Sequence, residues 1–250
     1  MVLRNAVNKA LGTLGFEIRR KADPTLDLSP DLRHIWARCQ RYTMTSLERM
    51  AALHDAVRYL EANRIGGDFV ECGVWRGSSS MNMALTLLAL GASDRELFLF
   101  DTFTGMSEPT VDDVDVHGRV AQTKFQTMAD GDVNKWCYAS IEEVRDNLRS
   151  TGYPQHRLHL VKGKVEDTLP ASAPERIALL RLDTDWFEST QHELVHLFPR
   201  LVPGGVMIID DYGHWQGARR AVDGYFENHR LKPLLFRIDY TGRMMLNVGR

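Results

Sequence analysis

Two apolar segments that each end abruptly in acidic residues constrain the fold of this chain most. RIALLRLD (176–183) and GGVMIIDD (204–211) each have the pattern of a strand that is buried on both faces. Such strands are typical of parallel sheets that carry helices on both sides. The two segments therefore favour an α/β fold, with the acids at the carboxyl ends of neighbouring strands.

The rest of the chain alternates between apolar strand patterns and amphipathic helix patterns, as βαβ units do. Further strands are expected at 67–73, 96–101 and 157–163, helices at 81–90, 140–151, 186–198 and 218–229, and a terminal hairpin from 234–238 and 243–248. A polar stretch rich in Asp, Gly and Thr separates the second strand from the next helix, over about 102–135. The pattern predicts a parallel sheet covered on both faces.

Length and composition fit one such domain. The chain has 250 residues, of which 44% are hydrophobic and 26% charged, enough for a sizeable core. We expect residues 1–50 to form a helical extension or cap and residues 51–250 to form the main domain. No internal repeat or low-complexity linker interrupts the pattern.

Charge and cysteine content limit the partners and the compartment. The net charge is −2, so no basic excess points to nucleic acid. The three cysteines have no C-x-x-C spacing, which fits a reducing, cytoplasmic setting better than a disulfide framework. No apolar run is long enough for a membrane span. Residues 1–20 have the spacing of a short amphipathic helix, which favours a surface helix or a contact in a homo-oligomer over a membrane anchor.

HELVH, at residues 192–196, fits the zinc-protease pattern H-E-x-x-H. In the expected helix, Phe187, Leu194, Val195 and Phe198 share the apolar face, and both histidines fall on the opposite, solvent-facing side. A catalytic zinc also needs a third protein ligand, and nothing specifies the one nominee, Glu227. We therefore interpret HELVH as a solvated helix face.

A glycine-rich turn follows the first strand, in FVECGVWRGSS. Gly73 and Gly77 let a ligand approach the backbone closely, and the serines open a helix whose N–H groups favour an anion. Glu71 suits an ammonium group, and Asp101, which ends the second strand, is placed to accept hydrogen bonds from a ribose. The spacing is not G-x-G-x-x-G. The pattern therefore predicts a nucleoside that carries an amino acid, as S-adenosylmethionine does.

The acids of the two opening segments predict a cation site. Asp183 and Asp185 leave one strand, and Asp210 and Asp211 leave the other. Packed carboxylates repel one another unless a cation lies between them, and an all-oxygen ligand set favours Mg²⁺ over zinc. The alternative for Asp183 and Asp185 is a helix N-cap, and for Asp210 and Asp211 a turn.

Several long motifs together resemble the macrocin O-methyltransferase family, whose members are metal-dependent and methylate sugar hydroxyls in macrolide and aminocoumarin pathways. The motifs are YTMTSLERM, GDFVECGVWRGSSSM, FLFDTFTGM, GKVEDTLP, LRLDTDWFEST and GGVMIIDDYG, and the likeness runs from about Arg41 to the C-terminus. The resemblance implies a Rossmann-like seven-stranded methyltransferase sheet, mostly parallel with a reversed last strand, and implies S-adenosylmethionine and Mg²⁺ as cofactors.

Roles for individual residues follow from the same resemblance. It implies that Asp183, Asp210 and Asp211 bind Mg²⁺ and that Asp185 is the candidate base. By the same likeness, Tyr42, Thr43 and Met44 border the methionine portion, Ser79 its carboxylate, and Val165 and Glu166 the adenine. The 102–135 stretch is implied to be a lid over the acceptor.

The expected function is transfer of a methyl group from S-adenosylmethionine to a hydroxyl of a sugar or glycoside with vicinal hydroxyls. A catechol acceptor would satisfy the same metal geometry. A nucleotide-sugar glycosyltransferase also uses a D-x-D at a strand end, but that alternative leaves ECGVWRGSS and the Asp210–Asp211 pair unexplained. A non-catalytic binding protein would not need four converging acids.

Overall fold

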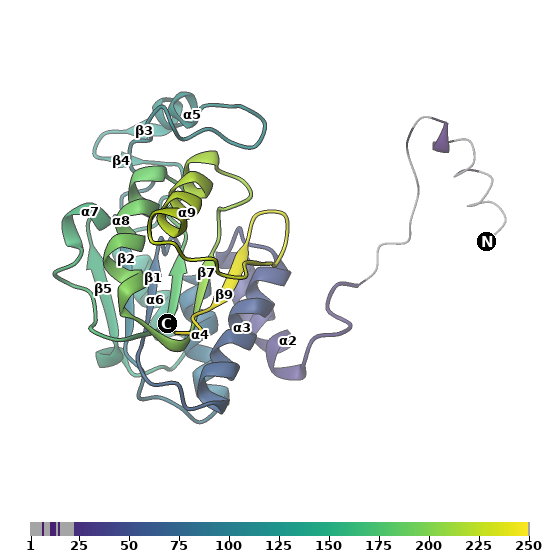
Figure 1. Cartoon of the computed structure of the whole chain (residues 1–250). Helices are drawn as coiled ribbons and strands as arrows, with labels where there is room; N and C mark the ends of the chain where they lie inside the picture. The colour runs from purple at the N-terminus through teal and green to yellow at the C-terminus, as the bar shows by residue number, and fades with distance from the viewer. Residues whose placement is uncertain (1–6, 8–10, 14, 16–22, 250) are drawn as a thin grey trace.

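The computed structural model describes residues 7, 11–13, 15 and 23–249, so most of the predicted N-terminal helix lies outside the described residues. A seven-stranded sheet forms the centre of the molecule, in the order β5-β2-β1-β6-β7-β9-β8 (Figure 1). β9 is the last strand of the chain and runs antiparallel to both of its neighbours, while the other pairs in the sheet are parallel. The predicted mostly parallel sheet with a reversed last strand is confirmed.

The strands lie close to their predicted ranges, and the terminal hairpin is present. They are β1 (Asp68–Cys72), β2 (Leu97–Asp101), β5 (Leu158–Lys162), β6 (Ile177–Leu182), β7 (Leu201–Ile209), β8 (Phe236–Arg237) and β9 (Arg243–Leu246). Alternate side chains of each central strand enter two different cores, as the period of two requires. In β1, Phe69 packs into one core and Val70 into the other.

Helices cover both faces of the sheet (Figure 1). One face carries α2 (Pro30–Cys39), α3 (Leu47–Ala62), α4 (Ser78–Ala89) and α6 (Ile141–Arg149), and the other carries α7 (Val165–Thr168), α8 (Phe187–Leu197) and α9 (Gln216–Asn228). Ile35 and Cys39 of α2 are buried in the first core, so this helix packs against the sheet-bearing body. No helix within the described residues has the length and apolar character needed to cross a membrane.

The polar 102–135 stretch is more ordered than its composition suggests. It contains α5 (Ala121–Met128) and a small hairpin of β3 (Ala129–Asp130) and β4 (Val133–Asn134), and it lies above one end of the sheet (Figure 1). Its two ends meet, because Asn134 N–H donates to the carbonyl of Thr104 at 2.8 Å and Met106 N–H to that of Trp136 at 3.0 Å. We call residues 104–136 the lid segment.

The lid segment is fastened to the body by buried groups. The carboxylate of Asp113, which is fully buried, accepts a hydrogen bond from Phe187 N–H at 2.8 Å, and Trp186 Nε1–H donates to the carbonyl of Ser107 at 3.0 Å. Trp136 of the lid also packs on Trp186 and Trp215. These contacts hold the lid segment in place over the carboxyl ends of the strands.

Candidate active site

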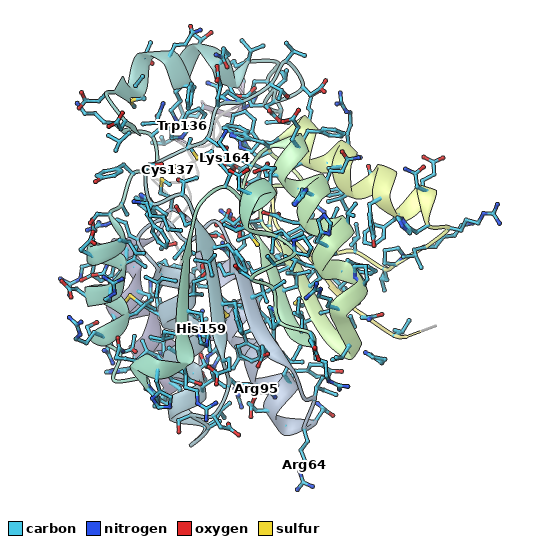
Figure 2. The ribbon with its side chains drawn as sticks, turned by 90° about the vertical axis from the view of Figure 1, so that its left-hand side faces the viewer. Arg64, Arg95, Trp136, Cys137, His159 and Lys164 are labelled. Atoms are coloured by element: carbon cyan, nitrogen blue, oxygen red, sulfur yellow. The ribbon has the colours of Figure 1, made fainter. Side chains whose placement is uncertain are left out.

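A cavity of about 430 Å³ opens at the carboxyl edge of the sheet, beneath the lid segment. Figure 2 shows Trp136, Cys137 and Lys164 between the strand ends and the lid, with Arg95 and His159 nearer the opposite edge. The cavity collects almost every residue that the sequence singled out, namely Tyr42, Thr43, Met44, Gly73, Ser79, Asp101, Val165, Glu166, Asp183, Asp185, Asp210 and Asp211. The sequence predicted that these strand ends lie at one edge of the sheet, and they do.

The glycine turn and Asp101 form one wall of this cavity. Gly73 has φ +83°, and a Cβ at that position would lie 1.9 Å from the carbonyl oxygen of Asp183, so only glycine fits. The Asp101 carboxylate accepts hydrogen bonds from the backbone N–H groups of Val74, Trp75 and Phe103, at 2.7, 2.9 and 2.7 Å. Asp101 therefore holds the turn in shape as well as lining the cavity.

Glu71 does not line the cavity, although the sequence predicted it as a site residue. Its side chain is 1% exposed, and its carboxylate accepts hydrogen bonds from Ser80 Oγ–H and, at 2.8 Å, from Arg181 Nη1–H. The side chain of a strand residue alternates between faces, and that of Glu71 points into the protein rather than toward a ligand. In this conformation Glu71 faces an internal arginine and not the ammonium expected from the sequence.

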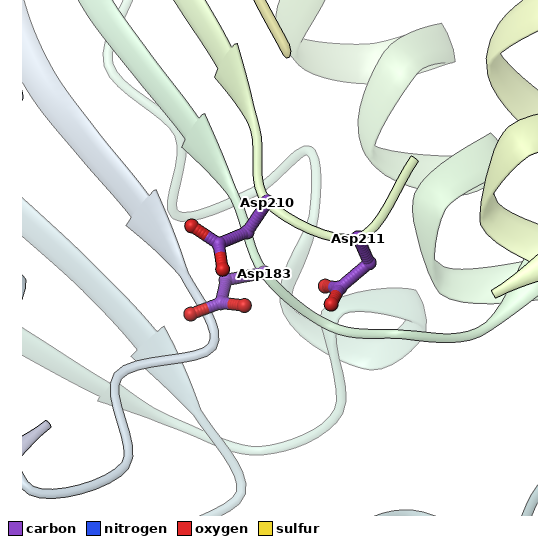
Figure 3. Close-up of side chains that lie close together, drawn as sticks. All are labelled: Asp183, Asp210 and Asp211. Carbon is purple, nitrogen blue, oxygen red and sulfur yellow. The ribbon is translucent and has the colours of Figure 1, made fainter. Parts of the chain in front are cut away.

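The four predicted aspartates come together at the ends of β6 and β7. Asp183, Asp210 and Asp211 place one carboxylate oxygen each within 4.8 Å of one another (Figure 3). Asp183 N–H donates to Cys72 O at 2.8 Å and Asp210 N–H to Leu182 O at 2.9 Å, so the sheet itself fixes both positions. Parallel pairing of β6 with β1 and β7 thus brings the acids into register.

Burial raises the pKa values of Asp183, Asp185 and Asp211. The pKa of Asp185 is raised to about 7, mainly by burial and further by Asp183 and Asp210. Burial likewise raises the pKa of Asp183 and Asp211 well above the usual range, and neighbouring carboxylates add to the shift. Asp185 shares a side-chain hydrogen bond with Asp211 and adopts φ +68°, a left-handed conformation that is strained for this residue type.

These residues fit a hard divalent cation. All three grouped side chains are carboxylates, the ligand type that Mg²⁺ prefers. Asp211 Oδ2 is buried and has no hydrogen-bond partner among the described residues, which is costly unless another group completes its environment. An ion held by Asp183, Asp210 and Asp211 would supply that partner and relieve the repulsion among the carboxylates.

Two arginines that the sequence analysis did not single out also enter the cavity. Arg181 lies within the apolar strand β6 and pairs with Glu71, Asp183 and Asp210. Arg49 of α3 pairs with Asp210 and, at 3.0 Å, with Asp239. Arg181 could have been found from the sequence, because it is the one charged residue inside the otherwise apolar strand β6. Nothing in the local sequence distinguishes Arg49 from other arginines on amphipathic helices.

Aromatic side chains line the outer part of the cavity. Trp136 of the lid carries Lys124 Nζ over its ring at 4.0 Å. On the other side, His214 contacts Trp215 and Tyr240 edge-on, and the ring of Tyr240 is 56% exposed. The inner part of the site is therefore acidic, whereas its outer part carries aromatic side chains together with Lys124.

HELVH lies on α8, away from the acid cluster. His192 and His196 are neighbours with ring centroids 4.4 Å apart and ring planes tilted by 57°, and both are half-buried rather than fully solvated. Glu193 between them is fully buried on the core side, whereas Val195, which we predicted to face the core, is 48% exposed. The prediction for Val195 is wrong, because the helix turns Glu193 rather than Val195 toward β6.

Comparison with solved structures defines the class of protein. The O-methyltransferase NovP superposes with a TM-score of 0.72 at 31% sequence identity, covering 83% of each chain. The calicheamicin methyltransferase CalS11 superposes with a TM-score of 0.59 and covers 92% of this chain; at 18% identity, it supports the fold alone. The fold is that of a methyltransferase.

The sequence comparisons identify the family. Residues 30–246 match the Macrocin-O-methyltransferase (TylF) family. A tetracenomycin-C rhamnosyl 4′-O-methyltransferase of Streptomyces olivaceus is 36% identical over 201 residues, covering 80% of this chain and 74% of the relative. Demethyldecarbamoylnovobiocin O-methyltransferase of Streptomyces niveus is 33% identical over the same length. The chain belongs to the macrocin O-methyltransferase family.

Proposed function

We propose that this protein transfers a methyl group from S-adenosylmethionine to a hydroxyl of a sugar or glycoside in a Mg²⁺-dependent reaction. The observation that carries the proposal is the meeting, in one cavity, of the Gly73 turn with the carboxylates of Asp183, Asp210 and Asp211. The first is suited to a nucleoside that carries an amino acid, and the second to a hard cation.

The donor would lie along the wall formed by β1, β2 and the segment before α3. Asp101 is positioned for the ribose, Ser79 at the start of α4 for the carboxylate, and Val165 and Glu166 for the adenine. Tyr42 and Met44 close the methionine side of the same wall. This arrangement would direct the sulfonium methyl group of a bound donor toward the acid cluster.

The chemistry requires an activated hydroxyl beside that methyl group. When bound, Mg²⁺ would lower the pKa of the acceptor hydroxyl and fix its direction. Asp185 then takes the hydroxyl proton while the acceptor oxygen attacks the methyl carbon in line. The new C–O bond forms as the C–S bond breaks, and S-adenosylhomocysteine leaves. Holding the two reactants in line can contribute about 7–11 kcal/mol to the lowering of the barrier.

The acceptor would enter between the lid segment and the loops after β7 and β8. Trp136 on one side, and His214 with Tyr240 on the other, offer flat apolar surfaces that suit the less polar face of a sugar ring. The names of the related enzymes include a rhamnosylated tetracenomycin and a novobiocin precursor, which supports a glycoside acceptor. A catechol would also satisfy the metal geometry and remains the second candidate acceptor.

Metal removal tests the proposal directly. Purified protein should methylate members of a glycoside panel with labelled S-adenosylmethionine, lose this activity in EDTA, and recover it with added Mg²⁺. Asp211→Asn should raise the Mg²⁺ requirement or abolish turnover, because it removes a charged ligand whose free oxygen is buried. Full activity in chelator would refute the metal-dependent mechanism.

A matched variant on the other candidate motif separates the two metal hypotheses. His192→Ala should leave the response to EDTA and Mg²⁺ unchanged, because this side chain lies on α8 outside the cavity. Loss of bound zinc and of activity in this variant would instead support HELVH as the metal site. Running catechols beside glycosides in the same assay decides between the two acceptor classes.

A further inference from the structure

The most unusual charged group beneath the site is Arg181. Its side chain is 4% exposed and emerges from the middle of the sheet, where a charge is costly unless it is fully paired. One nitrogen bonds Glu71 Oε1 at 2.8 Å and Asp183 Oδ2 at 2.7 Å, and the other bonds Asp210 Oδ1 at 2.6 Å. A single guanidinium thus bridges two proposed metal ligands and one acid that lies outside the cavity.

The fork of the guanidinium fixes how the two aspartates present their oxygens. Arg181 binds one oxygen of Asp183 and one oxygen of Asp210, in a planar geometry that lysine could not reproduce. Each carboxylate keeps further lone pairs for other partners. The bridge therefore holds Asp183 and Asp210 side by side before any cation arrives.

Glu71 determines how much of the arginine charge reaches the site. It bonds Arg181 Nη1, whereas Asp210 bonds Nη2; it is 1% exposed, and Ser80 Oγ–H fixes its second oxygen. A buried carboxylate at this distance offsets a large part of the positive charge of Arg181, because buried pairs are only weakly screened. Without Glu71, the full charge of Arg181 would oppose a divalent cation at the same aspartates.

We propose that the buried Glu71–Arg181 pair sets the charge beside the site: Arg181 presets Asp183 and Asp210 and lowers the affinity for the divalent cation, and Glu71 offsets that loss of affinity. Both are positioning residues, acting through the aspartates rather than by touching the reactants. The inference rests on the proposed Mg²⁺ site. It predicts that removing either partner changes metal affinity, and that the two changes have opposite signs.

The sign for each variant follows from charge. Arg181→Met removes a positive charge beside the cation, and Glu71→Gln leaves that charge uncompensated. Loss of an orienting partner typically weakens metal binding about 10–100-fold. A unit charge a few ångströms from a divalent ion has a larger effect than this, even at an effective dielectric constant of about 20. Charge should therefore prevail over orientation in the arginine variant.

The experiment is a titration of metal-free protein with Mg²⁺ by calorimetry, at mildly alkaline pH and without donor or acceptor. Arg181→Met should bind Mg²⁺ at least about tenfold more tightly than wild type, and Glu71→Gln about tenfold more weakly. The double variant Glu71→Gln/Arg181→Met restores the net charge and should return to within about threefold of wild type, because the two opposite charge effects add and cancel.

The ion pair between Arg95 and Glu61 provides a matched control. It is also largely buried, with a separation of 2.7 Å, but it lies toward the opposite edge of the sheet (Figure 2). Arg95→Met should lower thermal stability without changing Mg²⁺ affinity. Circular dichroism would verify folding, and Glu71→Gln decides the question if Arg181→Met does not fold, since glutamine keeps the size and the contact with Ser80.

Two results would overturn the inference. In the first, wild type binds Mg²⁺, but both single variants shift the Mg²⁺ affinity in the same direction, or neither variant differs in affinity from Arg95→Met. This result would leave the proposed function intact and would make the Glu71–Arg181 ion pair purely structural. In the second, wild type itself binds no Mg²⁺, which refutes the metal-dependent function together with the inference.

Discussion

Asp185, the proposed general base, occupies a position where this role and the stability of the fold oppose each other. Its pKa is raised to about 7 from a usual value of 3.8, mainly by burial, so the folded protein favours the protonated side chain. As the pH rises from about 4 to 7, the unfolded state loses this proton first, and the folded state becomes relatively less stable. Above pH 7 the cost is fully present, and a shift of this size corresponds to up to about 4 kcal/mol.

Asp185→Asn should therefore stabilise the metal-free protein while impairing the enzyme. In EDTA at a pH above 7, thermal unfolding should show a higher Tm than wild type, and the difference should shrink as the pH falls toward 4. Turnover should fall on the order of 10²–10⁴-fold, as expected for loss of a general base. If the variant turns over at nearly the wild-type rate, another group takes the proton, and Asp185 serves only at the start of α8.

Asp101→Ala should weaken binding of S-adenosylhomocysteine and lower Tm as well. The structure shows three backbone N–H groups that would lose their acceptor. Each unpaired group costs about 1–3 kcal/mol where water cannot replace the carboxylate. Calorimetry with S-adenosylhomocysteine measures the first effect, and unchanged affinity would remove Asp101 from the donor site.

At the residue scale, the sequence predicted which acids gather but not how they are neutralised. Three of these acids directly follow apolar strands, namely Asp183, Asp210 and Asp211. Because parallel strands end at the same edge of a sheet, the sequence predicts that these acids lie together there. The role of Glu71 could not be read in this way, because its partner Arg181 is distant in sequence and belongs to a strand that reads as apolar.

Among the elements, the lid segment is the one whose structure the sequence revealed least. Its helix α5 and hairpin β3–β4 are short, and polar residues dominate them, so no clear periodicity marks them. They are positioned by contacts to distant parts of the chain, such as Asp113 with Phe187 and Trp136 with Trp186. The sheet strands and the helices between them were predictable because each buries a long apolar face.

Gly105→Ala should disturb the lid without disturbing the donor site. Gly105 has φ +91°, and a Cβ there would lie 1.8 Å from the carbonyl oxygen of Asn134, at the junction of the two ends of the lid segment. The ends would have to separate, so the KM for the acceptor should rise at least about tenfold, the size of effect that misplacing site groups produces. The dissociation constant of S-adenosylhomocysteine should stay close to wild type.

Gly118→Ala is the matched control for that experiment. Gly118 also has positive φ, at +81°, and also belongs to the lid segment, but a Cβ there meets nothing within 4 Å. It reproduces the backbone strain without the clash. Equal rises of the acceptor KM in both variants would mean that strain, and not the meeting of the lid ends, controls acceptor binding.

For the whole molecule, ligand-induced stabilisation distinguishes the proposed donor from a nucleotide sugar. A ligand that binds only the folded state at about 100 times its dissociation constant stabilises it by about 2.7 kcal/mol. S-adenosylhomocysteine should therefore raise Tm by several degrees, and UDP-sugars with Mn²⁺ should not. The reverse pattern in a thermal-shift assay would favour the glycosyltransferase alternative.

The meeting of the lid ends also bears on how such enzymes could diversify. Because Thr104, Met106, Asn134 and Trp136 are joined by backbone hydrogen bonds, the intervening loop leaves and re-enters the body at nearly one place. A segment closed in this way behaves as a cassette, which can be lengthened, shortened or exchanged while the strand ends below keep their register. Transplanting it from a relative would then alter which hydroxyl is presented, with the methyl donor and its binding wall inherited unchanged.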